Sequence, residues 1–358
     1  MTNLRCCGLR IAAVLIVAIG GTALTQAISA NQDLRVCHMI ATGGTIAMKI
    51  DPVKNAPVPA LSGEDLVAGV PELAKVAKVR VESLFNLPSP HLTAEHWMAI
   101  RKSVLKALSD DEVSGVIISH GTDTLEETAY FLDLTVRSDK PIILVGAQRN
   151  ASDRDFDGPR NLVNASRICV SETALGKGAM IVLNGQINAA REATKTHTSD
   201  VESFKSGDFG FLGVVDHDRV VFTRSPMRRQ HVPVTGDALP RVDIVPLYSG
   251  ADAALFRAAI AAGAKGVVIQ AFGWGNINVP LYEAMQEAIA KGIVVVISTR
   301  VPNGRVLPIY GFKGGGKTLK EAGAVFADNL SPHKARILLM LALQTTSNAG
   351  EIQQLFDR

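Results

Sequence analysis

Short apolar runs alternate with amphipathic stretches along most of this chain. A strand that is apolar throughout is buried on both faces, and such strands occur almost only in parallel sheets covered by helices. Strand and helix signals that alternate in this way are typical of α/β folds. In the first half of the chain, the strand signals cover residues 34–41, 115–119, 141–145 and 178–183, and the helix signals cover residues 94–108, 125–136 and 158–175. The sequence therefore predicts a doubly wound, mostly parallel sheet.

The alternation stops after residue 222 and resumes at residue 241. Residues 223–240 carry Pro226, Pro233, Gly236 and Pro240 among polar residues, which indicates a linker. Further strand signals follow at residues 242–246, 266–270 and 293–298, and a last helix signal covers residues 331–343. A chain of 358 residues is long enough for two domains. We predict a larger N-terminal domain over residues 31–222 and a smaller, parallel α/β C-terminal domain over residues 241–358.

Residues 1–30 resemble a signal peptide. Arg5 and Arg10 precede an apolar run at residues 11–24, and small residues follow that run. The run is shorter than the roughly 20 apolar residues that span a bilayer. We therefore expect this segment to be cleaved, which leaves a periplasmic or secreted protein without a membrane partner. An uncleaved N-terminal anchor is the alternative.

The charge of the chain gives no sign of a nucleic-acid partner. The formal charge is +3, from 37 basic and 34 acidic residues, and two of the basic residues lie within residues 1–30. Binding to phosphates needs a clustered excess of Lys and Arg. The densest basic cluster is only the pair Arg228 and Arg229.

Two cysteines, Cys37 and Cys169, remain after residues 1–30 are removed. They could pair in an oxidising compartment. However, Cys37 lies in a strand signal and Cys169 in a helix signal. We therefore favour two separate buried thiols over a disulfide.

Two polar clusters follow strand signals, where open α/β sheets bind their ligands. The first is TGGT at residues 42–45, and the second is HGTDT at residues 120–124. Glycine allows the backbone to approach a ligand closely, and backbone N–H groups can stabilise an oxyanion. The threonines could instead cap the helices that follow. Because two such clusters occur at successive strand ends, we favour a binding or catalytic site.

A third polar stretch, residues 191–206, places Lys195 between Thr194 and Thr196. A lysine in a loop is usually solvated. Lys195 becomes a catalytic candidate only if the fold brings its amine to a threonine hydroxyl, where it can act as a base.

These segments together resemble the bacterial L-asparaginase/glutaminase family. The resemblance rests on residues 41–47 (ATGGTIA), on residues 119–132 (SHGTDTLEETAYFL), and on residues 194–198 (TKTHT). Residues 157–162 (DGPRNL) and 334–336 (KAR) are similar to further segments of the family. The similarity covers nearly the whole chain after residue 30, in the same order.

The resemblance implies a hydrolase that cleaves the side-chain amide of L-asparagine, with L-glutamine as a further substrate. Thr45 matches the nucleophile, while Thr122, Asp123 and Lys195 match a buried Thr–Lys–Asp constellation. Asp123 and Ser89 match residues that hold the substrate's ammonium and carboxylate groups, and Thr122 also belongs to this binding set. Asn276 matches a residue that reaches the site of a neighbouring subunit. The resemblance further implies a homotetramer that needs no metal and no organic cofactor.

This sequence departs from the family at three positions. Ala56 stands where many members have a tyrosine, in the loop after the first threonine cluster. Pro90 stands where the family has a glutamine, and residues 300–317 have no match for a glutamate that some members supply from the adjacent subunit. These departures leave open a non-catalytic protein that binds amino acids in the periplasm. A subunit of a tRNA-dependent amidotransferase is a third possibility, which the signal peptide and the lack of a basic surface oppose.

Residues 311–318 (GFKGGGKT) also satisfy the phosphate-binding pattern GxxxxGKT. That pattern needs a buried strand before it, but only residues 306–310 precede it here, and they include Pro308. We therefore do not favour a nucleotide site.

Overall fold

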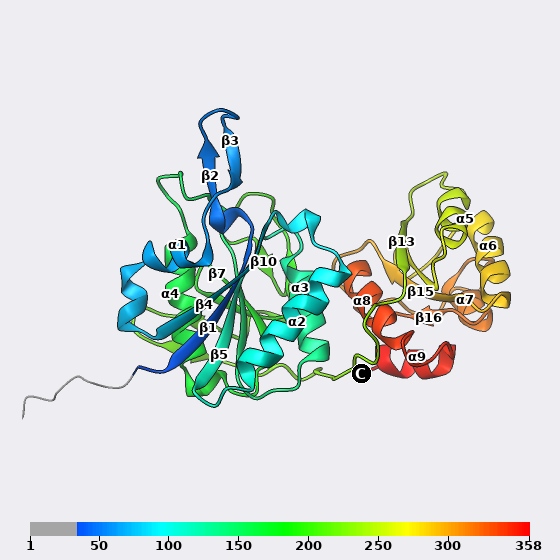
Figure 1. Ribbon diagram of the computed structural model, residues 1–358. Coiled ribbons are helices and arrows are strands. Elements are labelled where there is room, and N and C mark those ends of the chain that lie inside the picture. The colour runs from blue at the N-terminus through cyan, green and yellow to red at the C-terminus, as the bar shows by residue number, and fades with distance from the viewer. Residues whose placement is uncertain (1–33) are drawn as a thin grey trace, which may run out of the picture. The chain divides into compact units, whose positions relative to one another are not determined.

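The continuous apolar runs form the centre of an eight-stranded sheet in a computed structural model that describes residues 34–358 (Figure 1). The strand order is β12-β11-β8-β7-β6-β5-β1-β4. Strands β4, β1, β5, β6 and β7 are parallel neighbours, whereas β8, β11 and β12 add an antiparallel edge. The strands are β1 (Val36–Gly43), β4 (Lys78–Leu87), β5 (Val113–Ser119), β6 (Ile142–Val145), β7 (Ala179–Leu183), β8 (Gln186–Ala189), β11 (Gly213–Val215) and β12 (Val220–Phe222).

Helices cover both faces of this sheet, as its buried strands require. Along β1, Met39 belongs to the core on the face covered by α1 (Gly63–Ala68) and α4 (Gly158–Cys169). The next residue, Ile40, belongs to the core with α2 (Ala94–Leu108) and α3 (Leu125–Thr135) on the opposite face. The predicted doubly wound, mostly parallel sheet is therefore confirmed.

A second, smaller sheet has four parallel strands in the order β13-β14-β15-β16. This confirms the predicted smaller parallel α/β part. Its strands are β13 (Val242–Pro246), β14 (Gly266–Ala271), β15 (Val294–Thr299) and β16 (Val325–Phe326). The helices of this half are α5 (Ala254–Ala261), α6 (Val279–Ala290), α7 (Gly316–Glu321), α8 (Pro332–Ala342) and α9 (Ala349–Phe356).

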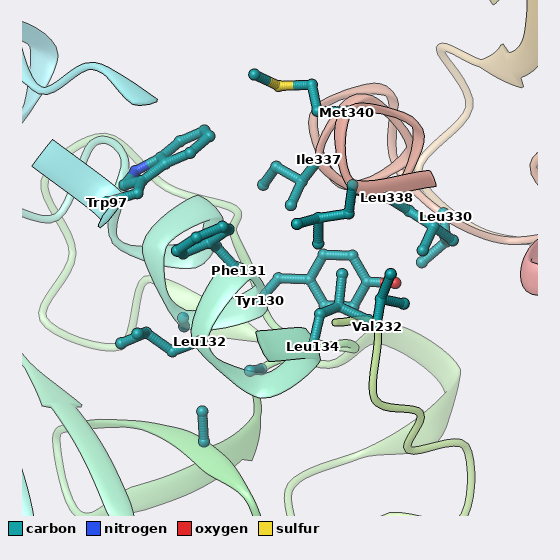
Figure 2. Close-up of a cluster of buried hydrophobic side chains, with 14 of the residues drawn as sticks. Trp97, Tyr130, Phe131, Leu132, Leu134, Val232, Leu330, Ile337, Leu338 and Met340 are labelled. Carbon is teal, nitrogen blue, oxygen red and sulfur yellow. The ribbon is translucent and has the colours of Figure 1, made fainter. Parts of the chain in front are cut away.

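Residues 223–240, all of them described, form neither helix nor strand, yet they are anchored to the rest of the chain. The Val232 N–H donates to the Leu134 carbonyl over 2.8 Å, and the Val232 side chain is buried. Figure 2 shows Tyr130 of α3 beside Leu338 of α8 and Val232, and all three belong to one hydrophobic cluster. Core packing therefore continues from α3 to α8. The division into domains at residues 31–222 and 241–358 stays a prediction.

The expectation of two separate thiols was wrong, because Cys37 and Cys169 form a disulfide. Their Cα atoms lie 6.2 Å apart, within the ordinary range for such a bond. Cys37 is on β1 and Cys169 is the last residue of α4, and both side chains belong to the same buried cluster. Strand and helix signals place each cysteine in its element, but they do not show that α4 ends over the first residues of β1.

The predicted signal peptide lies outside the described residues. Among the helices of residues 34–358, none combines the length and the apolar composition that a membrane span needs. Two small antiparallel pairs complete the fold: β2 (Met48–Asp51) with β3 (Ala56–Pro59), and β9 (Thr194–Lys195) with β10 (Phe204–Lys205).

Candidate active site

The two threonine clusters meet because their strands, β1 and β5, are parallel neighbours with Ala41 opposite Ser119. Gly44 lies against Gly121 so closely that a Cβ added to Gly44 would be 2.2 Å from the Gly121 Cα. The backbone of Gly44 also has a φ of 85°, which favours glycine. Thr45 and Thr122, which follow these two glycines, therefore come from turns in direct contact.

Thr124 occupies the N-cap position of α3, but no threonine side chain of these clusters makes a capping hydrogen bond in the described structure. Thr42 donates its hydroxyl to the Ser119 carbonyl over 2.8 Å, and Thr124 donates its own to the Ser89 carbonyl over 3.0 Å. Thr45 opens a short 3₁₀ helix, Thr45–Ala47, and its hydroxyl makes no hydrogen bond within the described part of the chain. The partly buried Thr45 hydroxyl is thus left available to a ligand.

Lys195 reaches the second cluster from a distant part of the chain. Its Nζ donates to Thr122 Oγ1 over 2.9 Å and to Asp123 Oδ1 over 2.7 Å. The Lys195 side chain is 18% exposed, whereas that of Asp123 is 60% exposed. The fold therefore brings together the three residues that the resemblance matched to a buried Thr–Lys–Asp constellation, but Asp123 is exposed, so the expected burial was wrong for this residue. One face of Asp123 stays open to a ligand.

Ser89 lies beside both glycine turns. It begins a 3₁₀ helix, Ser89–His91, just after β4, and only 2% of it is exposed. A Cβ added to Gly121 would be 2.7 Å from the Ser89 Oγ, so the hydroxyl adjoins the site. The buried Ser89 Oγ has no hydrogen-bond partner among the described residues. Since buried polar atoms are nearly always paired, this hydroxyl is a candidate for binding a polar group of the substrate.

Asn276 is not part of this cluster within residues 34–358. It lies after β14, where its backbone pairs with Phe272. Its side-chain oxygen, Asn276 Oδ1, is buried and unpaired in the described structure. The predicted role of Asn276 needs a second copy of the chain.

The loop that carries Ala56 folds into the hairpin of β2 and β3. Ala56 pairs with Asp51 near the hairpin turn and is exposed. The Ala151 N–H donates to the Met48 carbonyl over 2.9 Å and anchors the base of the hairpin. Ala56 brings no hydroxyl to the site, and Pro90 offers no polar side chain.

Backbone N–H groups of the glycine-rich segment at residues 311–318 donate to acceptors that are close in sequence. The N–H of Gly315 donates to the Phe312 carbonyl, that of Lys317 to the Tyr310 carbonyl, and that of Gly314 to Thr318 Oγ1. A phosphate-binding loop directs such N–H groups at phosphate oxygens. These three N–H groups already have partners, so they are not directed at a phosphate.

His120, which motif analysis left without a role, holds the turn of the second cluster in place. Its ring is fully buried, with Nδ1 donating to the Gly121 carbonyl over 2.7 Å. Nε2 accepts from the Thr128 hydroxyl over 2.9 Å. Burial lowers the pKa of His120 to about 4, although the bond to Gly121 opposes this shift. His120 is therefore neutral in the folded protein at neutral pH.

This pKa predicts a loss of stability in acid. The unfolded histidine titrates near 6.5, so the unfolded chain gains a proton before the folded chain does, and stability falls as the pH drops through this range. Compared with a His120→Asn variant, the wild type should lose about 2–3 kcal/mol of unfolding free energy between pH 7 and pH 4.5. Urea unfolding at fixed protein concentration measures this difference. If the difference in unfolding free energy between the wild type and His120→Asn is the same at both pH values, the pKa of His120 is not lowered in the folded protein.

Comparison with known proteins adds a separate line of observation. A family model described as "Asparaginase, N-terminal" matches residues 35–228, and one described as "Glutaminase/Asparaginase C-terminal domain" matches residues 241–356. The chain is 38% identical to the L-asparaginase 2 of Bacillus subtilis, over 92% of this chain and 88% of that protein. It is 36% identical to a probable periplasmic L-asparaginase of Haemophilus influenzae, over 91% of this chain and 93% of that protein.

A solved structure shows the same fold. The crystal structure of a probable cytoplasmic L-asparaginase from Campylobacter jejuni matches with a TM-score of 0.83 and 35% identity. The match covers 90% of this chain and 99% of that one.

Proposed function

The chain belongs to the asparaginase family and is an L-asparaginase-type amidohydrolase, and we propose that it hydrolyses L-asparagine to L-aspartate and ammonia through a threonine nucleophile. The contact of Lys195 Nζ with Thr122 Oγ1 and Asp123 Oδ1 is the observation that carries this proposal. An amide is a poor electrophile, so its cleavage needs a positioned hydroxyl, a proton acceptor and donors to the oxyanion.

In the proposed reaction, Thr45 Oγ1 attacks the side-chain amide carbon of the substrate. The Thr45 proton passes to the Thr122–Lys195 pair and then to the leaving nitrogen, so that ammonia departs and an acyl-threonine remains. Water then attacks this ester, releases L-aspartate and restores the Thr45 hydroxyl. Asp123 holds the substrate ammonium, and Ser89 Oγ donates to its carboxylate.

The missing tyrosine at position 56 needs a replacement in this scheme. The candidates are another hydroxyl, that of Thr42 or Thr122, and a bound water. Thr42 is 1% exposed and already donates to Ser119, so it is not free to exchange a proton with a substrate. Thr122 is therefore the favoured replacement, with a bound water as the alternative. L-Glutamine, which is one methylene longer, is the further substrate that we propose.

We also propose that the protein is a homotetramer in which Asn276 of one copy completes the site of another. The unpaired Asn276 Oδ1 supports this assignment. Near Asn276 in sequence, the exposed ring of Trp274 stacks on Tyr310 at a centroid distance of 5.8 Å, and Tyr310 contacts Phe312 in a tilted arrangement at 5.7 Å. Exposed aromatic rings in contact with each other are typical of protein interfaces.

Export from the cytoplasm is the proposed location. The Cys37–Cys169 disulfide supports it, because disulfides persist in oxidising compartments. Among similar proteins, that of H. influenzae is described as periplasmic and that of C. jejuni as cytoplasmic. These two descriptions differ, so the proposal of export rests on the predicted signal peptide and the disulfide.

One preparation tests these proposals. The full-length gene is expressed in a Gram-negative host, and the periplasmic fraction is purified. Intact mass gives the N-terminus, light scattering gives the assembly, and ammonia release is measured on a panel of free amino-acid amides. We expect a chain starting near residue 31, a tetramer, and turnover of L-asparagine.

Two outcomes would contradict these proposals. If the protein binds asparagine without releasing ammonia, and an Ala56→Tyr variant is equally inactive, the non-catalytic alternative is favoured. An intact Met1 would overturn export.

A further inference from the structure

Two buried charged residues hold the backbone of the segment that carries Lys195. Glu126 on α3 accepts the Lys195 N–H at Oε2 over 2.8 Å. Lys334 on α8 donates from Nζ to the Arg191 carbonyl over 3.0 Å and also to the Ala193 carbonyl. These contacts fix the main chain at and just before Lys195.

Both residues are deeply buried, with 6% of Glu126 and 2% of Lys334 exposed. Burying a charge is costly unless it is paired and hydrogen-bonded, and apolar residues of similar size often stabilise a core at least as well. The cost is visible at Lys334, where burial lowers the pKa to about 8. Packing α8 against α3 does not by itself need two buried charges. Both charges instead hydrogen-bond the main chain of residues 191–195 and so hold it in place.

The second oxygen of Glu126 is also occupied. His333 Nε2 lies 3.2 Å from Glu126 Oε1, and this contact raises the pKa of His333 against the effect of burial. Burial pushes the pKa of Glu126 upward, but its bond to His333 and the charge of Lys334 lower it overall, so the carboxylate stays ionised. The Lys195 N–H and His333 contact different oxygens of Glu126, and the Thr194 side chain also hydrogen-bonds the carboxylate, so these contacts together set its orientation toward Lys195.

We propose that Glu126 and Lys334 are positioning residues that aim the Lys195 side chain at Thr122 and Asp123. This inference rests on the proposed function of Lys195 as a proton relay. Lys334 lies more than a hundred residues after Lys195, on a helix of the C-terminal half. The catalytic group of the N-terminal half is therefore completed by α8 of the same chain.

The expected kinetic effect follows from geometry. A displacement of about 1 Å at a reacting group costs roughly 10²-fold in rate. We expect Glu126→Ala to lower kcat for L-asparagine by about 10²-fold with little change in KM, because the substrate contacts at Ser89 and Asp123 stay in place. Glu126→Gln keeps an acceptor oxygen and should retain most of the rate.

Asp133 provides a matched control. It lies on the same helix, is also 6% exposed, and pairs with Arg229 instead of the Lys195 segment. Asp133→Asn should lower stability without changing kcat. If Glu126→Ala does not fold, Lys334→Met, which removes both donated bonds, is expected to give the same loss of kcat.

A second readout does not depend on activity. Hydrogen–deuterium exchange should be faster at the peptide that contains Lys195 in Glu126→Ala or Lys334→Met, and unchanged there in Glu126→Gln and Asp133→Asn. If exchange at the Lys195 peptide is unchanged in both Glu126→Ala and Lys334→Met, the positioning role is overturned, even if the wild type hydrolyses asparagine. Faster exchange together with a wild type that releases no ammonia would refute the proposed function and leave the positioning role intact. If Asp133→Asn loses as much kcat as Glu126→Ala, Glu126 contributes only to the general stability of the protein and does not position Lys195.

Discussion

A Thr45→Ala variant is expected to fold normally and to lose about 10⁴-fold or more of its asparagine hydrolysis, as when the nucleophile of a catalytic unit is removed. The Thr45 hydroxyl makes no hydrogen bond within residues 34–358, so its removal leaves no buried partner unpaired. Little stability should therefore be lost. Ammonia release under saturating asparagine measures the rate, and thermal unfolding checks the fold.

Thr42→Val is the matched control, because Thr42 belongs to the same cluster but donates to the Ser119 carbonyl. Loss of that bond should cost about 1 kcal/mol of stability with little effect on turnover. Thr45→Ser should retain measurable activity, since it keeps a hydroxyl at the same place. If Thr45→Ala stays within a few fold of the wild type, Thr45 has only a local structural role and the nucleophile lies elsewhere.

The central strands of the larger sheet were predictable because burial on both faces makes them apolar throughout. Strand β6, Ile142–Val145, is an example, and every one of its residues is buried. Strand β4 was missed because it is an edge strand in which Lys78, Arg80 and Glu82 alternate with apolar residues. The antiparallel strands β8, β11 and β12 were missed for a different reason: each has only three or four residues, too few for a clear periodic pattern.

The residues that meet at the candidate site could be selected from motifs, but the residues that hold them in place could not. Glu126 lies within a recognised motif, yet only the fold shows that its carboxylate accepts the Lys195 N–H. Lys334 and His333 come from a helix that is far from Lys195 in sequence. The pairing of Cys37 with Cys169 was missed for a similar reason. Such contacts depend on how helices pack on the sheet, which local sequence patterns do not specify.

The second large effect is expected for Lys195→Met, which should lower kcat by about 10³-fold or more, as when one member of a proton-relay unit is removed. Methionine has a similar length but cannot donate to Thr122 Oγ1 or Asp123 Oδ1, the two atoms that Lys195 Nζ contacts. Steady-state kinetics on asparagine measure the change. Lys205→Met is the matched control, because Lys205 lies on the paired strand β10 and its amine contacts Glu202 instead of the site.

Two further measurements decide whether Lys195 acts together with Thr122. If they form one relay, Thr122→Val combined with Lys195→Met should be about as slow as either single variant, because residues that act as a unit are strongly non-additive. Independent contributions would multiply instead. Asp123→Asn should also raise KM, since Asp123 is proposed to hold the substrate ammonium, whereas Lys195→Met should leave KM nearly unchanged. A folded Lys195→Met variant that keeps the wild-type rate would make Lys195 a structural partner of Asp123 and would remove the relay from the mechanism.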